Sequence, residues 1–204
     1  MGLLEYEEMS FLLHYARMSG VFVDCGANIG IYSLLLGKIC QKGFAIEPST
    51  DTYEILERNL QINDLDNVMS CQIGVGDKAG TLYFTKGLDA VNHIVEDFST
   101  VDCEQISVDT LDAICAEEKD LISIIKIDVE GHEREVLRGA LEIFSNPLLN
   151  VVIMETFGSP ELTDFMREKG FTLYVYEPRT RTLSVPESFG AGNNGIFNWD
   201  IKLA

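Results

Sequence analysis

Cysteine is sparse in this chain, and no two cysteines are spaced as a pair. The 204 residues contain five of them, Cys25, Cys40, Cys71, Cys103 and Cys115. A zinc site or a disulfide framework requires closer spacing, such as Cys-x-x-Cys. The sequence therefore predicts free and mostly buried thiols, and it argues against a small scaffold held together by disulfides.

Long apolar runs are also absent. No stretch approaches the roughly 20 consecutive apolar residues that a membrane-spanning helix needs. Residues 1–20 lack the basic and apolar regions of a signal peptide. We therefore expect a cytoplasmic protein that does not insert into membranes.

Positive charge is the third shortage. The chain has 15 Lys and Arg against 33 Asp and Glu, which gives a formal net charge of −18 at pH 7. Nucleic-acid phosphates and anionic membrane surfaces attract basic patches, so both would repel this protein. A nucleic-acid partner is therefore not expected, and the acidity by itself requires no role beyond solubility.

The remaining composition is that of a soluble globular protein, with 46% apolar and 24% charged residues. The length suits a single domain over residues 1–204. Apolar strand-like runs alternate with helical patterns from residue 21 to residue 176. This alternation predicts an α/β, Rossmann-like, doubly wound sheet of about seven strands, mostly parallel, with helices on both faces.

The predicted strands cover residues 21–24, 43–47, 68–75, 122–129, 150–155, 171–176 and 195–201, and the last is antiparallel. The predicted helices include a segment within residues 1–20, one that follows the first strand, and residues 51–63, 111–117, 133–144 and 161–169. Residues 80–108 interrupt this alternation with three short strand-like stretches. We predict that they form a small inserted β section with antiparallel pairing.

The most informative segment follows the first strand, where residues 24–30 read Asp-Cys-Gly-Ala-Asn-Ile-Gly. Its glycines permit a close approach of backbone and ligand, and the turn is expected to aim free N–H groups into the crevice. The spacing differs from the Gly-x-Gly-x-x-Gly of dinucleotide-binding folds. It resembles instead the first motif of methyltransferases that use S-adenosylmethionine (SAM). The residues predicted to hold the methionine end of SAM are Asp24, Gly26, Asn28 and Gly30.

An acidic residue ends the second strand. Glu47 follows the glycine turn by about 20 residues, the usual interval to an acid that binds ribose. Its carboxylate can accept hydrogen bonds from both ribose hydroxyls. NAD presents the same ribose, but the looser glycine turn disfavours a pyrophosphate. Asp77, after the third strand, is predicted to reach the adenine amino group, with a plain turn residue as the alternative.

A second dense cluster occupies residues 126–140, which read Lys-Ile-Asp-Val-Glu-Gly-His-Glu-Arg-Glu-Val-Leu-Arg-Gly-Ala. Lys126, Asp128 and Glu130 alternate along the end of an apolar strand. Charges in such a place are costly unless they are paired or face a cleft. We predict that they face the mouth of the cofactor crevice.

With this second cluster, the chain resembles the FkbM-type methyltransferases. The matching segments are residues 22–30, 45–48, the helix that contains Asn59 and Asn63, and residues 108–111, 126–140 and 152–155. The resemblance implies a class I methyltransferase fold, SAM as the donor, and transfer mostly to a hydroxyl oxygen. It also implies a small-molecule or carbohydrate acceptor.

Methyl transfer requires in-line alignment of donor and acceptor, and a hydroxyl acceptor benefits from a general base or a metal. Asp128, Glu130 and His132 are the catalytic candidates nearest the expected methyl position. Asp128 is preferred as the base, with an ion pair to Lys126 as its alternative role. His132 titrates in a suitable range, but it lies at the first turn of a helix, where capping histidines are common.

Other possibilities stay open. Asp128 and Glu155 end neighbouring predicted strands, so they could hold a divalent metal such as Mg²⁺, and His93 could reach the cleft from the inserted section. The alternative functions are a non-catalytic scaffold that binds SAM or a nucleoside, an N- or C-methyltransferase on the same fold, and an NAD-dependent oxidoreductase. The acids that accompany the glycine turn disfavour the scaffold, and the glycine spacing disfavours NAD.

Overall fold

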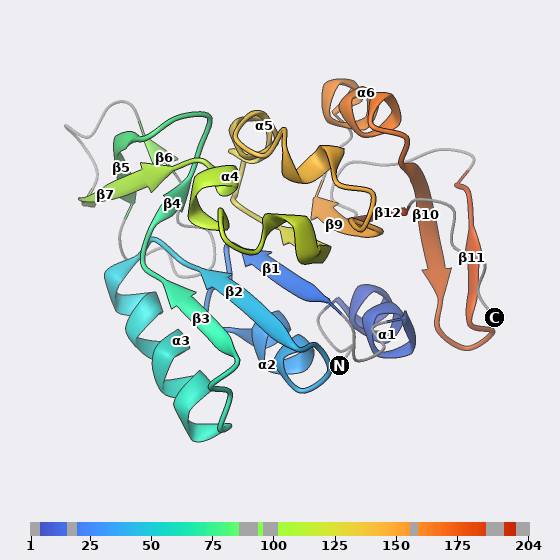
Figure 1. Cartoon of the computed structure of the whole chain (residues 1–204), viewed down its shortest axis with the longest axis horizontal. Helices are drawn as coiled ribbons and strands as arrows, with labels where there is room; N and C mark the ends of the chain where they lie inside the picture. Colours follow the sequence, from blue (N-terminus) through green and yellow to red (C-terminus); the bar gives the residue numbers. More distant parts are fainter. Residues whose placement is uncertain are drawn as a thin grey trace.

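The computed structural model describes residues 5–15, 20–85, 94–95, 102–155, 159–186 and 194–198. In this part of the chain, eight strands form a central sheet in the order β11-β10-β12-β9-β8-β1-β2-β3 (Figure 1). Their bounds are β1 Val21–Cys25, β2 Lys42–Ile46, β3 Val68–Cys71, β8 Ile122–Ile127, β9 Val151–Glu155, β10 Thr172–Glu177, β11 Thr182–Ser184 and β12 Asn194–Asn198. The prediction of a mostly parallel α/β sheet is confirmed.

The parallel centre of the sheet is built from apolar runs. Every residue of β1 is buried, and β1 pairs in parallel with β2 and with β8. Strands covered on both faces need side chains that tolerate burial on both sides, which explains why Val, Ile and Phe make up most of β1 and β8. The carboxyl ends of β1, β2 and β8 therefore meet at one edge of the sheet.

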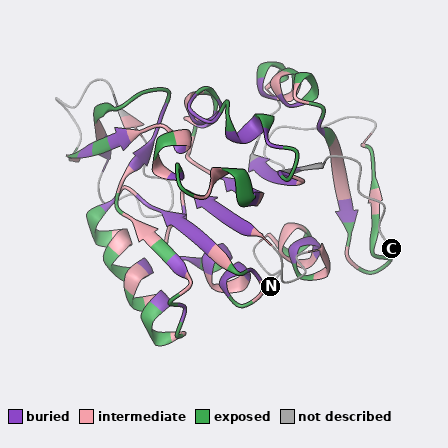
Figure 2. Cartoon of the chain, viewed as in Figure 1, coloured by how far each residue is buried: buried purple, intermediate pink, exposed green. Residues whose placement is uncertain are grey.

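Helices cover both faces, as predicted (Figures 1 and 2). One apolar core joins the sheet to α1 Tyr6–Tyr15, α2 Ile31–Gly37 and α3 Thr50–Ile62. A second core, on the other face, joins it to α4 Leu111–Ile114, α5 Glu133–Arg138 and α6 Pro160–Glu168. Helix α1 docks on β10 through an edge-to-face contact of Phe11 with Tyr176, whose ring centroids are 5.5 Å apart.

The inserted section forms a separate small sheet in the order β4-β7-β5-β6. Its strands are β4 Gly74–Val75, β5 Gly80–Thr85, β6 Ile94–Val95 and β7 Cys103–Asp109. The antiparallel pairing predicted for residues 80–108 is confirmed for β5 with β6 and with β7, whereas residues 91–93 of the predicted middle strand lie outside the described residues. A cluster of Phe84, Ile106 and Val108 forms the core of this sheet.

The single strand predicted for residues 68–75 is wrong. The chain turns after β3, where the N–H of Ile73 donates to the carbonyl of Cys71 (3.1 Å). Gly74 and Val75 then pair in parallel with Val108 and Asp109 of β7. One apolar run therefore contributes to two sheets, because its last residues pair with β7 of the small sheet and not with the central sheet.

The helix predicted for residues 133–144 is also shorter. Helix α5 ends at Arg138, and a 3-10 turn follows at Ile143–Ser145. The carbonyl of Gly139 accepts from the N–H of Asp112 (3.0 Å), and the Asp112 carboxylate accepts from the N–H groups of Glu142 and Ile143 (3.0 Å each). These bonds to the neighbouring α4 replace the helical ones.

The end of the sheet differs from the prediction in the number of its strands. Residues 182–184, expected to be loop, form β11 by pairing antiparallel with β10, which raises the count from about seven to eight. Strand β12 is antiparallel, as predicted, and lies between β9 and β10.

Among the described residues, no helix is long and apolar enough to cross a membrane. The five cysteines are free, as predicted, and Cys25, Cys40 and Cys115 are buried.

Candidate active site

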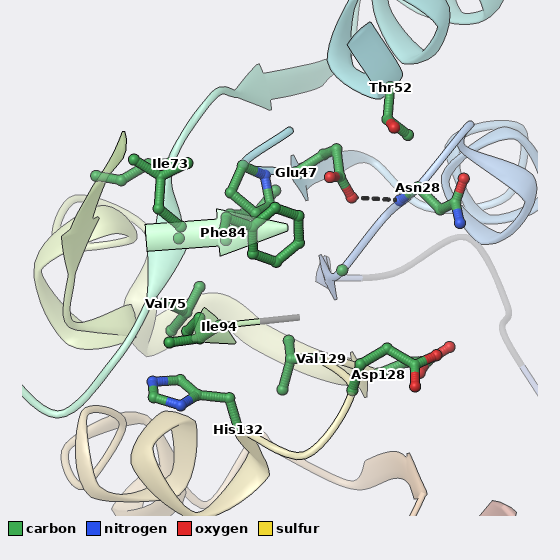
Figure 3. Close-up of a pocket in the computed structure, with 16 residues that line it drawn as sticks. Asn28, Glu47, Thr52, Ile73, Val75, Phe84, Ile94, Asp128, Val129 and His132 are labelled. Atoms are coloured by element: carbon green, nitrogen blue, oxygen red, sulfur yellow. Dashed lines mark hydrogen bonds between the residues drawn. The ribbon is translucent and has the colours of Figure 1, made fainter. Parts of the chain in front are cut away.

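A pocket opens where the carboxyl ends of β1, β2 and β8 meet the small sheet (Figure 3). Parallel α/β sheets bind their ligands at this edge. The residues that line it include six of the predicted site residues: Gly26, Asn28, Glu47, Asp128, Glu130 and His132. Three sequence segments that are far apart in the chain thus meet at one place.

The glycine turn after β1 is held by bonds within the protein. The N–H groups of Gly26 and Ala27 both donate to the carbonyl of Ile46, at 3.0 and 2.9 Å. The N–H of Asn28 donates to Glu47 (3.0 Å), and that of Ile29 donates to the Asn28 side chain (2.7 Å). The expectation of free N–H groups is therefore wrong, because β2 and the turn itself accept them.

Gly26 has a specific steric reason to be glycine. Its φ is +73°, and a Cβ at this position would lie 1.8 Å from the carbonyl oxygen of Asp128. The absent side chain lets the segment after β1 touch the segment after β8, and the N–H of Asp128 donates to Cys25 (3.0 Å). The glycine thus sets the distance between two walls of the pocket.

Gly26→Ala is expected to lower the melting temperature by several degrees, because the methyl group forces these two segments apart at a backbone dihedral that alanine rarely adopts. Gly80→Ala is the matched control, since a Cβ there meets nothing within 4 Å. Thermal unfolding of both variants checks this prediction. Equal melting temperatures for Gly26→Ala and Gly80→Ala would contradict it.

Glu47 follows β2 and presents its carboxylate to the pocket (Figure 3). Its Oε2 accepts from the N–H of Asn28 and its Oε1 from the N–H of Ser49, both at 3.0 Å. Burial raises the pKa of Glu47, and these two N–H groups oppose the rise. The carboxylate is therefore held in one orientation, and the remaining lone pairs of its two oxygens can serve a bound diol.

Lys126 links the glycine turn to the segment after β8. Its Nζ donates to the Gly26 carbonyl (3.2 Å) and to Asp128 Oδ2 (3.1 Å), and it lies 3.9 Å from Asp24 Oδ1. Asp24 is fully buried and also accepts from the Ser33 hydroxyl (2.6 Å). Burial raises the pKa of Asp24, an effect that Lys126 and Ser33 oppose. The ion pair weighed for Asp128 is therefore present.

The segment between β8 and α5 carries unusual backbone. Glu130 has φ 50° and Gly131 has φ 92°. Glu133 is 3% exposed, and its carboxylate accepts from the N–H groups of Val129 and Gly131 at 3.4 and 3.2 Å. A left-handed glutamate that lines a pocket is a strained arrangement that marks functional sites. The supporting role of Glu133 was not predicted. The feature of the sequence that could have indicated it is the position of Glu133 at the start of the helix that follows Gly131.

His132 lies at the opposite end of the pocket from Asp128 (Figure 3). Its Nδ1 is 3.5 Å from a carboxylate oxygen of Glu135, and its Nε2 lies 3.7 Å from the place that a Cβ on Gly76 would occupy. The imidazole ring therefore lies beside the end of β4, which is a strand of the small sheet. Burial lowers the pKa of His132, and the charges of Glu135 and Asp77 oppose this effect.

This pKa has a consequence for stability. The folded protein binds a proton on His132 less readily than the unfolded chain does. His132 therefore contributes stability above about pH 6.5, the ordinary pKa of histidine. This stability is lost as the pH falls through the lower pKa of His132 in the folded protein. Between pH 7 and pH 5, the melting temperature of the wild type should fall more than that of His132→Gln. Parallel melting curves for the two proteins over this range would contradict the prediction.

The small sheet supplies an apolar wall that the sequence reasoning did not identify. Phe84 of β5, Ile94 of β6 and Ile106 of β7 line the pocket with Ile73 and Val75. In the sequence, these residues appear only as alternating apolar positions in short strands. That pattern does not indicate where the inserted sheet packs. The pocket thus has an apolar end at the small sheet and a charged end at the glycine turn.

Three predicted site residues do not line the pocket. Asp24 lies beneath it, where it faces Lys126, and Gly30 with φ +93° precedes α2. Asp77 is exposed and near His132. Their roles in binding a cofactor stay predictions.

The magnesium site that the sequence left open as an alternative gains no support. Strands β8 and β9 are neighbours, so Asp128 and Glu155 do end adjacent strands. Within the described part of the chain, no three His, Cys, Asp or Glu side chains gather as metal ligands. The Glu155 side chain and His93 lie outside the described residues.

Comparison with known proteins agrees with this architecture. Residues 24–173 match the model of the methyltransferase FkbM domain. The chain is 29% identical to methyltransferase sdnD of Sordaria araneosa over 206 residues, which cover 82% of this chain and 78% of that protein. It is 30% identical to the hexuronic acid methyltransferase AglP of Haloferax volcanii over 153 residues, which cover 74% of this chain and 62% of that protein.

The fold also matches a solved structure. The crystal structure of an FkbM methyltransferase from Methylobacillus flagellatus KT superposes with a TM-score of 0.58 at 19% sequence identity. The match covers 95% of this chain, which spans 50% of that chain. The family model spans both the glycine turn and the segment after β8, the two walls that meet at the pocket. The chain therefore belongs to the FkbM methyltransferase family.

Proposed function

We propose that this protein transfers the methyl group of SAM to a hydroxyl oxygen of a small-molecule or carbohydrate acceptor. The observation that carries the proposal is the Glu47 carboxylate, which two backbone N–H groups hold at the pocket beside the glycine turn. A ribose diol fits such an acceptor group. The absence of a Gly-x-Gly-x-x-Gly turn disfavours a pyrophosphate, so SAM suits the site better than NAD.

The charged end of the pocket suits the positive groups of SAM. Glu47, Asp128 and Glu130 place three carboxylates around it, and the nearby Lys126 faces Asp24 and Asp128. Carboxylates favour the sulfonium and the ammonium of the donor. When bound, SAM supplies the activated methyl group, and the protein orients donor and acceptor for displacement.

Removal of the acceptor proton is assigned to the segment after β8. Asp128 is anchored by Lys126, and Glu130 is presented to the pocket by a left-handed backbone that Glu133 supports. Both carboxylates line the charged end. We therefore propose that one of them accepts the hydroxyl proton and that the other positions the acceptor.

Calorimetric titration with S-adenosylhomocysteine (SAH) and with NAD tests the donor. We expect SAH to bind and NAD not to bind. Absence of SAH binding at millimolar concentration would overturn the proposal, and NAD binding would favour the oxidoreductase. The titrations are followed by incubation of a metabolite extract with isotopically labelled SAM and mass spectrometry. SAH binding without any labelled product would favour a non-catalytic scaffold, and label on nitrogen or carbon would indicate an N- or C-methyltransferase.

Asp128→Asn and Glu130→Gln separate the two catalytic roles. Loss of the general base is expected to lower kcat by about 10²–10⁴-fold, whereas loss of the positioning carboxylate mainly raises the KM for the acceptor. The initial rate of labelled-methyl transfer, measured at saturating SAM, distinguishes these effects. If both variants keep the wild-type kcat and KM, neither carboxylate has the proposed role.

A further inference from the structure

The charged side chains among the described residues that line the pocket are all acidic. They belong to Glu47, Asp128 and Glu130, and no described Lys or Arg joins them (Figure 3). His132 is the remaining titratable group of this lining. Burial lowers its pKa from the ordinary histidine value, so its ring is mostly neutral at pH 7 and does not offset the carboxylates.

Three cationic side chains on β8 and α5, between which the acidic segment of the pocket lies, already have acidic partners. The Nζ of Lys126 donates to Asp128 Oδ2 (3.1 Å), and the side chain of Lys126 is only 7% exposed. Arg134 and Arg138 of α5 both contact the Glu161 carboxylate of α6, the second at 3.9 Å. A negatively charged group of an acceptor would therefore have to compete with a protein carboxylate for each of these cations.

The proposed donor leaves most of this negative charge in place. SAM carries a sulfonium, an ammonium and a carboxylate, so its net charge is a single positive one. It offsets one of the three lining carboxylates. The net charge of −18 on the whole chain adds to the same field, and a cleft lined by charges of one sign concentrates that field. An acceptor therefore enters a pocket of negative potential even when SAM is bound.

The acidic lining acts differently on acceptors of different charge. A hydroxyl group can donate its hydrogen to a carboxylate, and a cationic group is attracted to it. A carboxylate, phosphate or sulfate group is repelled, and the repulsion is stronger in a pocket than in bulk water because the local dielectric constant is lower. Such a group also loses its hydration there without gaining a cationic partner. Charge therefore divides hydroxyl compounds into those that the pocket admits and those that it excludes.

We infer that the acceptor carries no negative charge, and that the lining carboxylates select neutral or amino-bearing hydroxyl compounds over those with a carboxylate, phosphate or sulfate group. The inference rests on the proposed methyl transfer and narrows its acceptor class. Among carbohydrates, it favours neutral sugars and amino sugars over uronic acids and sugar phosphates. The same three side chains thus attract the donor and exclude one class of acceptor.

The labelled product of the extract experiment gives the first test. A whole extract offers neutral, cationic and anionic compounds in competition, so the charge of the product reports the preference of the enzyme. We expect the methylated product to pass through an anion exchanger at pH 7. Retention of most of the label, once SAM and SAH have been removed, would overturn the inference. Absence of any labelled product would instead refute the proposed function.

A matched pair of acceptors gives the second test. The acceptor identified from the product is compared with an analogue that bears one added phosphate or carboxylate group. At saturating SAM, kcat/KM should be at least about tenfold higher for the acceptor without the added group. Raising the NaCl concentration from about 20 mM to about 200 mM should narrow this ratio, because salt screens the repulsion. A ratio near one, or a ratio that salt leaves unchanged, would contradict selection by charge.

Variants that remove one charge locate the effect in the pocket. Asp128→Asn and Glu130→Gln each remove a lining carboxylate, and each should lower the ratio by at least about threefold. A loss of kcat that is common to both acceptors cancels in the ratio, so the ratio separates acceptor selection from the catalytic roles. Glu168→Gln is the matched control, since this exposed residue ends α6 and does not line the pocket. Unchanged ratios in the two pocket variants, or an equal fall in Glu168→Gln, would overturn the inference.

Discussion

Replacement of Glu47 by alanine is expected to weaken SAH binding by at least about 100-fold. The carboxylate is proposed to accept both ribose hydroxyls, and hydrogen bonds to a charged group contribute about 1.5–3 kcal/mol each. Two such bonds correspond to at least about 3 kcal/mol, or about two powers of ten in the dissociation constant. The variant also leaves the N–H groups of Asn28 and Ser49 without their present acceptor.

Glu104→Ala is the matched control for Glu47→Ala. The Glu104 carboxylate also accepts a backbone N–H, that of Thr50 at 3.2 Å, but it does not line the pocket. Calorimetric titration should give wild-type SAH affinity for Glu104→Ala. A loss of less than tenfold in Glu47→Ala would show that this acid does not hold the ribose, and the proposed orientation of the donor would then be wrong.

Replacement of Lys126 by methionine is expected to lower the free energy of unfolding by about 3–5 kcal/mol, because removal of one partner of a buried ion pair leaves the other charge uncompensated. The side chain of Lys126 is 7% exposed and that of Asp24 is fully buried. Methionine keeps the apolar stem but not the ammonium, which also contacts the Gly26 carbonyl and lies 5.1 Å from the centre of the Tyr32 ring.

Urea denaturation of three variants tests the origin of this effect. Lys42→Met removes a more exposed pair with Glu118, in which the two side chains are 37% and 21% exposed, and it should cost less than about 1 kcal/mol. The double variant Lys126→Met/Asp24→Asn should recover part of the lost stability, because it removes the uncompensated charge. An equal loss in Lys126→Met and Lys42→Met, or no recovery in the double variant, would contradict this account.

The two effects separate binding from folding at one site. Glu47 projects into the pocket from the end of β2, so its loss should change affinity more than stability. Lys126 lies beneath the pocket and joins the glycine turn to Asp128, so its loss should change stability first and affinity as a consequence. Thermal unfolding with and without SAH distinguishes the two, since a ligand raises the melting temperature only of a protein that binds it.

Much of the parallel sheet could be predicted from the sequence. The strands β1, β2, β8 and β9 are mostly apolar, and β1, β8 and β9 are rich in β-branched residues. Helical patterns separate most of them, so local sequence suffices to identify them. The elements that were mispredicted depend on contacts with distant segments. Gly74 and Val75 leave the large sheet because β7 offers them partners, and α5 ends early because Asp112 of α4 accepts the N–H groups that follow it.

The same division holds for the site. The turn at Gly26, the acid at Glu47 and the cluster around Asp128 were recognisable because their chemistry lies in short, dense motifs. The apolar end was not, because Phe84, Ile94 and Ile106 come from three separate short strands that converge only when the inserted sheet folds.

The sequence by itself determined the fold class, the glycine turn and the acid at the end of the second strand, since each depends on residues that are close together in the chain. Only the tertiary structure showed that the N–H groups of the turn donate to acceptors within the protein and that Lys126 lies between Asp24 and Asp128. It also showed that the His132 ring lies beside Gly76, which follows β4 of the small sheet. The physical reason is the same in each case. A side chain's role depends on its charge, burial and partners, and these are set by segments that meet only in the folded chain.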